Sequence, residues 1–423
     1  AWTAVAHAHM ELGQYAQAES GYGEVLERVD EDDPQRGALT ENLAAAIYKQ
    51  GELASDAQEL ATAAEHFLRI QQVAPASSIR PAAEYDAAVA LIKLEEWSRS
   101  AEVLRAFRAD HVEHELQSEV TKQLAFVYQK AGELAQSADE FRRVAAQAEE
   151  PALRAESLLQ AGILYQRADR PDAALSVYGE YVEAFPEPLE PNVETRYTIA
   201  QLLRGRQDEA AYHEVLREIV TLDREAGTAR TDRVRYLAAQ AALVLAQPAY
   251  EHFASMALQL PFQESLAEKQ RRMDASLQVF EALPSYEVGE VTAAATYYMA
   301  EIYRNFSDAL LESQRPAGLT DAEQAEYNLV LEEEAYPFEE RAIEVHEANI
   351  ELARAGAYSN WVERSLEQLA RLVPGQYARA ELSAGYLPEI ERYAYRSPLA
   401  DVEDETMTAQ VQAAELLEVS RAH

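Results

Sequence analysis

The segment 154–186 has the clearest pattern of apolar and polar positions in the chain. Its apolar residues recur every three or four positions in two runs, which predicts two amphipathic helices. Pro171 separates the runs, because proline suits the first turn of a helix, and Pro186 ends the second run. Small residues in both runs let the helices approach closely, and larger residues beside them fill the remaining space. The small residues are Ala161, Gly162 and Ala174, and the larger ones are Leu158, Tyr165 and Tyr178.

This spacing resembles the tetratricopeptide repeat (TPR), a hairpin of two helices that cannot bury its apolar face alone and therefore stacks on neighbours. Weaker copies of the pattern occur elsewhere in the chain. In the copy at 38–75, more residues separate Gly51 from Ala63 than in the standard unit. We expect about eight inserted residues near Leu53–Leu60, which extend the first helix by about two turns. The other copies lie at 1–34, 38–75, 81–115, 116–150 and 192–227.

The repeat pattern ends after Gly227, and the remaining apolar pattern predicts longer helices. A buried helix at 231–246 should end at Pro248. Thr320 followed by Glu323 is a capping-box start for a later helix. The other predictions are long helices at 261–283 and 287–313, a linker at 314–320, a repeat-like pair at 329–374 and an acidic helix at 404–421.

The sequence therefore predicts an all-α protein in three parts. The resemblance implies a right-handed superhelical solenoid of six TPR units for residues 1–228. Residues 229–318 form a degenerate region of longer, irregular helices. Residues 319–423 form a TPR-like pair and an acidic C-terminal helical cap, as a solenoid needs a polar face at its end.

Composition narrows the possible functions. The chain has no cysteine, which excludes disulfides, thiolate metal sites and thiol catalysis. A net charge of -37 makes nucleic acid and anionic membranes unsuitable partners for the surface as a whole. The longest apolar run, 236–246, is too short to cross a bilayer. The first residues already lie inside a helix and no Met begins the chain, so we expect a processed or trimmed piece.

Motifs of catalysis are missing from the sequence. It contains no nucleophile elbow, phosphate-binding glycine loop or zinc-binding helix motif. His111 and His114 have a spacing that suits one helical face, but no third ligand accompanies them, so we expect solvated turn residues. The sequence therefore predicts a protein that is not an enzyme and that needs no cofactor or metal.

The resemblance also implies that the first helix of each repeat lines a concave surface. Four of the five lysines then fall on or beside one groove, which would attract acidic segments or a free C-terminal carboxylate. The alternative is that these cations are ordinary solvated helix ends. The predicted groove residues are Tyr48, Lys49, Tyr85, Val89, Lys93, Lys122, Phe126, Gln129, Lys130, Ile163, Gln166, Arg167, Tyr197, Gln201 and Arg204.

We therefore expect a scaffold that binds protein segments. Residues 336–381 resemble the C-terminal part of bacterial cell-envelope TPR proteins of the Tol/Ton and gliding motor systems, which implies a periplasmic or outer-membrane-associated protein; a cytoplasmic location is the alternative. Two other functions stay open. One is a structural subunit of a larger helical-repeat assembly, and the other is a small-ligand-binding or enzymatic protein with a pocket in 229–318.

Overall fold

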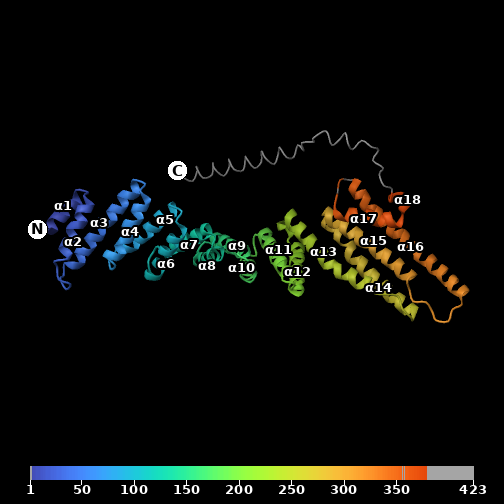
Figure 1. Ribbon diagram of the computed structural model, residues 1–423. Helices are drawn as coiled ribbons and strands as arrows, with labels where there is room; N and C mark the ends of the chain where they lie inside the picture. The colour runs from blue at the N-terminus through green and yellow to red at the C-terminus, as the bar shows by residue number, and fades with distance from the viewer. Residues whose placement is uncertain (1, 355, 357, 379–423) are drawn as a thin grey trace, which may run out of the picture.

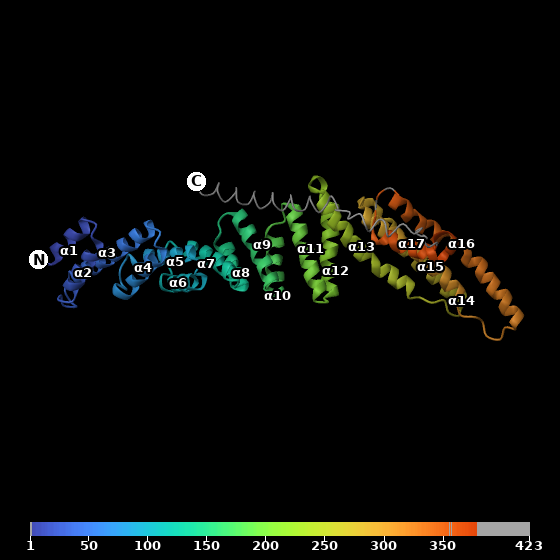
Figure 2. The ribbon, with the colours of Figure 1, turned by 45° about the horizontal axis from the view of Figure 1, so that its top comes forward.

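The computed structural model describes residues 2–354, 356 and 358–378, and within them the chain is helical, without strands. Figure 1 shows short helices following one another in a single row from the N-terminus, with longer helices gathered at the other end. The view in Figure 2 shows the same elongated arrangement. The predicted all-α fold is confirmed, and the short helices stack as the hairpins of a solenoid.

The first twelve helices form six hairpins, in which each helix packs on the next one along the chain. Their number equals that of the six predicted repeat units. Their bounds are α1 Trp2–Glu11, α2 Tyr15–Leu26, α3 Arg36–Asp56, α4 Leu60–Val73, α5 Arg80–Lys93, α6 Trp97–Asp110, α7 Gln117–Ala131, α8 Leu134–Gln147, α9 Pro151–Arg167, α10 Pro171–Ala184, α11 Leu189–Gly205 and α12 Glu209–Glu225.

Small residues occupy the crossing of the two helices in each hairpin. Gly162 of α9 shows why: a Cβ added there would lie 2.3 Å from Cε1 of Tyr178 on α10. No real side chain tolerates that distance, so the glycine permits the close packing of the tyrosine ring. The equivalent residues of the two preceding hairpins, Ala125 and Ala88, precede Gly162 at intervals of 37 residues, which is therefore the period of this part of the solenoid.

The second hairpin has the same crossing, and it corrects the predicted position of the inserted residues. A Cβ on Gly51 would lie 2.5 Å from the ring of Phe67, the same relation as between Gly162 and Tyr178. The part after Gly51 thus has standard length, and no insertion lies near Leu53–Leu60. The extra residues are at the start of α3, which is 21 residues long. The sequence misleads here because apolar residues also precede Gly51 at helical spacing.

Serine replaces alanine at two of the crossings and keeps its hydroxyl satisfied. Ser100 Oγ donates to the Ala88 carbonyl at 3.1 Å, and Ser137 Oγ donates to the Ala125 carbonyl at 2.7 Å. Both serines are fully buried. A small polar residue is therefore tolerated because the facing helix supplies the acceptor.

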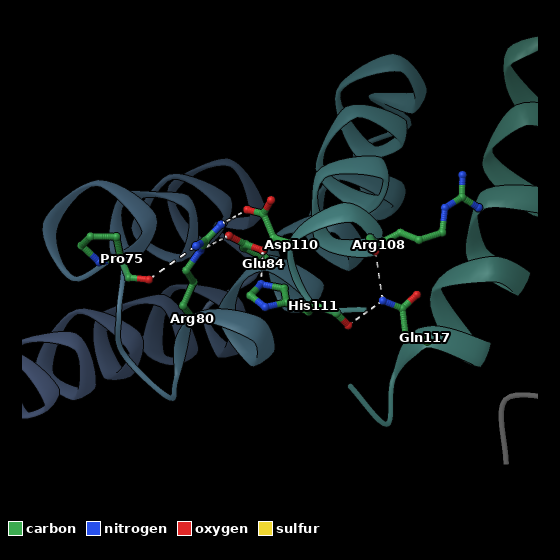
Figure 3. Close-up of polar contacts among 7 residues, drawn as sticks. All are labelled: Pro75, Arg80, Glu84, Arg108, Asp110, His111 and Gln117. Atoms are coloured by element: carbon green, nitrogen blue, oxygen red, sulfur yellow. Dashed lines mark hydrogen bonds and ion pairs between the residues drawn. The ribbon is translucent and has the colours of Figure 1, made fainter. Parts of the chain in front are cut away.

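Successive hairpins are joined by side chains that bind the end of the preceding helix. In Figure 3, Gln117 at the start of α7 points to the end of α6, where its Nε2 donates to the carbonyls of Arg108 at 3.2 Å and His111 at 2.6 Å. Carbonyls at a helix C-terminus lack partners within the helix. A residue of the next hairpin supplies the donor here.

The same arrangement recurs along the molecule, each time with two carbonyls three residues apart. It closes the end of α13 as well as the ends of two other repeat hairpins. The pairs are Arg36 with Leu26 and Val29, Asn192 with Val182 and Phe185, and Lys269 with Phe253 and Met256.

The long-helix region follows α12. α13 does not end at Pro248 as predicted, although the proline removes one hydrogen bond to the Val244 carbonyl. Buried Ala246 and Phe253 on either side hold the helix against its neighbours, and this packing outweighs the lost bond. The helices are α13 Asp232–Ala254, α14 Phe262–Glu281, α15 Gly289–Leu311, α16 Asp321–Arg354, α17 Asn360–Leu372 and α18 Pro374–Tyr377, with 3₁₀ turns η1 Gly227–Ala229 and η2 Leu283–Tyr286.

The capping box at the start of α16 is confirmed, since the backbone N–H of Thr320 donates to Glu323 at 2.8 Å and the Glu323 N–H donates to Thr320 Oγ1 at 3.4 Å. The apolar core of α13–α15 continues without interruption into α16 and α17, where Ala335, Phe338 and Trp361 join it. The chain segments on the two sides of residue 318 therefore share one core. The predicted acidic helix at 404–421 lies outside the described residues.

Candidate binding groove

Three consecutive hairpins present the same pair of residues on their first helix. Val89 and Lys93 of α5, Phe126 and Lys130 of α7, and Ile163 and Arg167 of α9 are each four residues apart, so each pair shares one helix face. Phe126 and Ile163 are 39% and 44% exposed, although both are large and apolar. We call these six residues the apolar–cation ladder.

The cations of the ladder are available for a partner. Among the described residues, Lys93, Lys130 and Arg167 form no ion pair. Lys130 Nζ lies 5.5 Å from the centre of the Phe126 ring, within cation–π range. The same ring meets Trp97 of the preceding hairpin edge-on at 6.0 Å, so an aromatic contact links two steps of the ladder.

A hollow of about 480 Å³ continues the ladder toward the N-terminus. One of its walls is the C-terminal half of α3, and another is α5. Its lining therefore contains four of the predicted groove residues together. The lining residues are Tyr15, Tyr48, Lys49, Glu52, Leu53, Ser55, Asp56, Phe67, Asp86, Val89, Ala90 and Lys93.

The charge of this hollow differs from the prediction. Lys49 pairs with Glu52, and this hydrogen-bonded ion pair raises the pKa of the lysine. Because α3 is extended at its start, Asp56 and not Lys49 occupies the position equivalent to Lys93. The predicted line of cations therefore begins at Lys93, and Lys49 lies on the wall beside it.

A partly buried hydrogen bond joins two residues that line the hollow. Tyr48 donates to Asp86 of the next hairpin, and burial raises the pKa of both groups. Tyr85 of α5, 37 residues after Tyr48, is also partly buried, and burial raises its pKa. These tyrosines contribute apolar surface and one polar edge each to the inner face.

The remaining predicted groove residues differ in their exposure and in their contacts. Lys122 is exposed and lies 3.4 Å from Glu119. Gln166 accepts a 2.6 Å hydrogen bond from Tyr178, which ties it to the core. Burial raises the pKa of Tyr197 on α11. Gln129 is half-buried on α7, and Gln201 and Arg204 are exposed on α11.

The two histidines considered as metal ligands take part in a joint between hairpins. His111 Nε2 lies 2.9 Å from buried Glu84, as Figure 3 shows, and Glu84 also accepts from Arg80 at 2.6 Å. His114 Nδ1 accepts from the Leu116 N–H at 3.2 Å. Within the described residues, no group of three or more His, Asp or Glu is placed to hold a metal ion.

Sequence reasoning missed a polar network in the long-helix region. Glu301 Oε1 lies 3.4 Å from His346 Nε2, and His346 Nδ1 lies 3.2 Å from Ser365 Oγ. This is an acid–histidine–serine sequence, but Ser365 is fully buried and accepts a 2.8 Å bond from Asn349. The residues come from α15, α16 and α17, so no local motif could reveal them. The burial of the hydroxyl makes this a core network, as catalysis needs a serine that a substrate reaches.

None of the helices in the described part is both long and apolar enough to cross a membrane.

Comparisons with known proteins find several similar solved structures. The repeat region is built of six stacked hairpins of two helices each. No protein-family model and no curated protein matches the sequence. Similar solved structures include MamA, at 16% identity over 43% of this chain and 94% of that chain, with a TM-score of 0.25.

Two further similar structures have repeats in their descriptions. One is a putative kinesin light chain with nearly identical TPR-like repeats from Podosopora anserina, at 18% identity over 44% of this chain and 93% of that one, with a TM-score of 0.24. The other is a tetratricopeptide repeat protein from Parabacteroides merdae, at 12% identity over 68% and 98%, with a TM-score of 0.28. At these values the likeness gives no information about function or partners.

Proposed function

We propose that this protein is a non-enzymatic scaffold that binds an acidic protein segment with apolar side chains along the first helices of its repeats. The apolar–cation ladder carries this proposal. A surface that repeats every 37 residues offers equivalent sites to successive parts of one extended segment. Exposed Phe126 and Ile163 offer apolar contact, and the three cations offer charge-assisted bonds to carboxylates.

The charge of the whole chain strengthens the selectivity of such a site. With a net charge of -37, the body repels acidic segments everywhere except where cations gather. The ladder, where three cations without an ion pair follow one another on adjacent hairpins, is therefore the favoured site for an acidic partner. The hollow next to Lys93 contains Glu52, Asp56 and Asp86. The part of the binding site that lies nearest the N-terminus of this chain therefore favours uncharged or basic groups of the partner.

A peptide titration tests the proposal. The probe is a fluorescein-labelled peptide of alternating Glu and Leu, measured by anisotropy, with Lys replacing Glu in a second peptide. Lys93→Glu with Lys130→Glu should weaken binding of the acidic peptide about tenfold or more, because two attractive charges become repulsive. Added salt should weaken the wild-type complex.

The matched control makes the same charge change elsewhere. Arg224→Glu with Arg371→Glu alters two exposed cations outside the ladder. If both double variants bind the acidic peptide equally, the ladder is not the site. Equal binding of the acidic and basic peptides also contradicts the proposal.

We also propose that the scaffold acts in a bacterial envelope complex. The support is the resemblance of residues 336–381 to envelope TPR proteins, which rests on sequence alone. Fractionation of the source cells with an antibody against the chain tests it. Recovery with the cytoplasmic markers would contradict the proposal.

A further inference from the structure

An apolar groove of about 260 Å³ opens between three helices of the long-helix region. α14 and α16 both pack on α15, and Figure 1 shows α15 between them. α15 therefore forms the floor and the other two form the walls. The lining residues are Phe262, Leu266, Gln270, Phe306, Leu310, Tyr327, Val330, Leu331, Glu334 and Phe338.

The groove leaves apolar side chains in solvent. Val330 is 51% exposed, although it lies on the lining face of α16 between Tyr327 and Glu334. Floor and wall meet at an aromatic contact, in which the ring centres of Phe306 on α15 and Phe338 on α16 are 4.5 Å apart. About half of Val330 is left in solvent, so a partner that covers it gains the burial of apolar surface.

The α16 side of the rim is acidic, although the guanidinium of Arg315 lies 5.8 Å from the centre of the Tyr327 ring. Residues 321–340 contain eight carboxylates and no lysine or arginine. Residues three or four positions apart are neighbours on a helix surface. Val330 is therefore flanked by Glu326 on one side and by Glu333 and Glu334 on the other. Pro337 has no N–H, so the carbonyl of Glu333 lacks its usual helix donor. Carboxylates and a carbonyl all accept hydrogen bonds, so a partner that carries hydrogen-bond donors complements them.

We propose that this groove binds an amphipathic helix from another protein, with lysine or arginine beside its apolar face. The lining residues of α16, from Tyr327 to Phe338, extend over about 16 Å, which matches about three turns of a partner helix. Helical partners fill such grooves with apolar anchors three or four residues apart. Basic residues beside the anchors pair with the glutamates of the rim.

Charge argues against the chain itself as the occupant. A second copy brings another net charge of -37 to an acidic rim. In residues 379–423 of the same chain, acidic residues outnumber lysines and arginines by nine to four. Like charges that face one another at this rim oppose both forms of self-association.

The test uses a designed peptide of about 14 residues with Leu at i, i+3, i+4 and i+7 and Lys at the flanking positions. Binding to the full chain is followed by fluorescence anisotropy. We expect saturable binding, and no binding of a second peptide in which Glu replaces every Lys. Val330→Asp should weaken the complex about tenfold or more, because it places a charge on the apolar lining.

Leu329→Asp is the matched control, since Leu329 is 56% exposed on the same helix but does not line the groove. It should change the affinity less than about twofold, and both variants keep the wild-type circular dichroism, as neither side chain is buried. Equal effects of the two substitutions would overturn the proposal, as would equal binding of the acidic peptide. A wild-type dimer in light scattering that Val330→Asp dissociates would also overturn it, since a second copy would then occupy the groove.

Discussion

The repeat region, α1–α12, and the long-helix region, α13–α17, bury their helices in different ways. In the repeats, a small residue such as Gly162 meets one large residue such as Tyr178, and the contact recurs with a fixed interval. In the long-helix region, polar groups are fully buried at single positions. Lys269 and His346 have exposures of 1% and 0%. The comparison teaches that the repeats present the same kind of surface several times, whereas each surface of the long-helix region occurs at one place.

The largest expected effect concerns the contact that recurs. Tyr178→Ala should lower the free energy of unfolding by about 3–5 kcal/mol, because it removes a buried ring and leaves a cavity beside Gly162. Urea unfolding followed by circular dichroism measures it. The control Tyr236→Ala, at a ring 37% exposed, should cost less than about 1 kcal/mol. Similar costs at the two sites would mean that the crossing is not the source of stability in the repeats.

The buried lysine distinguishes the long-helix region by its response to pH. Within the described residues Lys269 forms no ion pair with a carboxylate. Its Nζ donates to Asn305 Oδ1 at 2.7 Å and to two carbonyls. Burial lowers the pKa of Lys269 to about 8, below the value of about 10.4 in the unfolded chain. The unfolded state therefore binds more protons between these values, so stability rises as the pH increases from about 8 to about 10.

This gain should not exceed about 3 kcal/mol, and Lys269→Met should remove it. Unfolding midpoints in urea at a series of pH values measure the difference between wild type and variant. Above about pH 10 stability should fall as the pH rises. Burial raises the pKa of Tyr165 and Tyr178 to about 12, and the stability that these protonated tyrosines contribute is lost as the pH rises through that value. Parallel curves for wild type and Lys269→Met would contradict the assignment of the gain to this lysine.

The smallest effect compares two glycines of one hairpin. Gly162→Ala should destabilise the protein by about 1–3 kcal/mol, because its Cβ overlaps the Tyr178 ring. Gly179→Ala on α10 meets no atom within 4 Å and should stabilise by about 0.5–1 kcal/mol, since alanine favours helix. Thermal unfolding of both variants gives the signs. Stabilisation by both substitutions would show that the helices move apart at no cost and that the close crossing is not required.

The sequence predicts most of the repeat region, because each hairpin contains the local spacing that forms it. Val89, Phe126 and Ile163 appear at equal intervals, so their common place on the first helices follows from the pattern. The position of the extra residues in α3 could not be predicted from the sequence, because its apolar residues fit the repeat pattern in two alignments. Only the contact between Gly51 and Phe67 decides between them.

The long-helix region is less predictable for a physical reason. Pro248 indicates the end of a helix locally, and only packing at distant positions keeps α13 intact. The network of Glu301, His346 and Ser365 joins three helices that no repeat relates. The groove beside Val330 likewise depends on how α14, α15 and α16 come together.

The donors that reach back from one hairpin to the end of the previous one have a consequence for engineering. A cut between α6 and α7 would separate Gln117 from the carbonyls of Arg108 and His111 and leave both without their bond. A cut within the turn of a hairpin leaves these bonds intact. The transplantable module is therefore a second helix together with the first helix of the following hairpin, and chimeras built on that boundary should keep their joints closed.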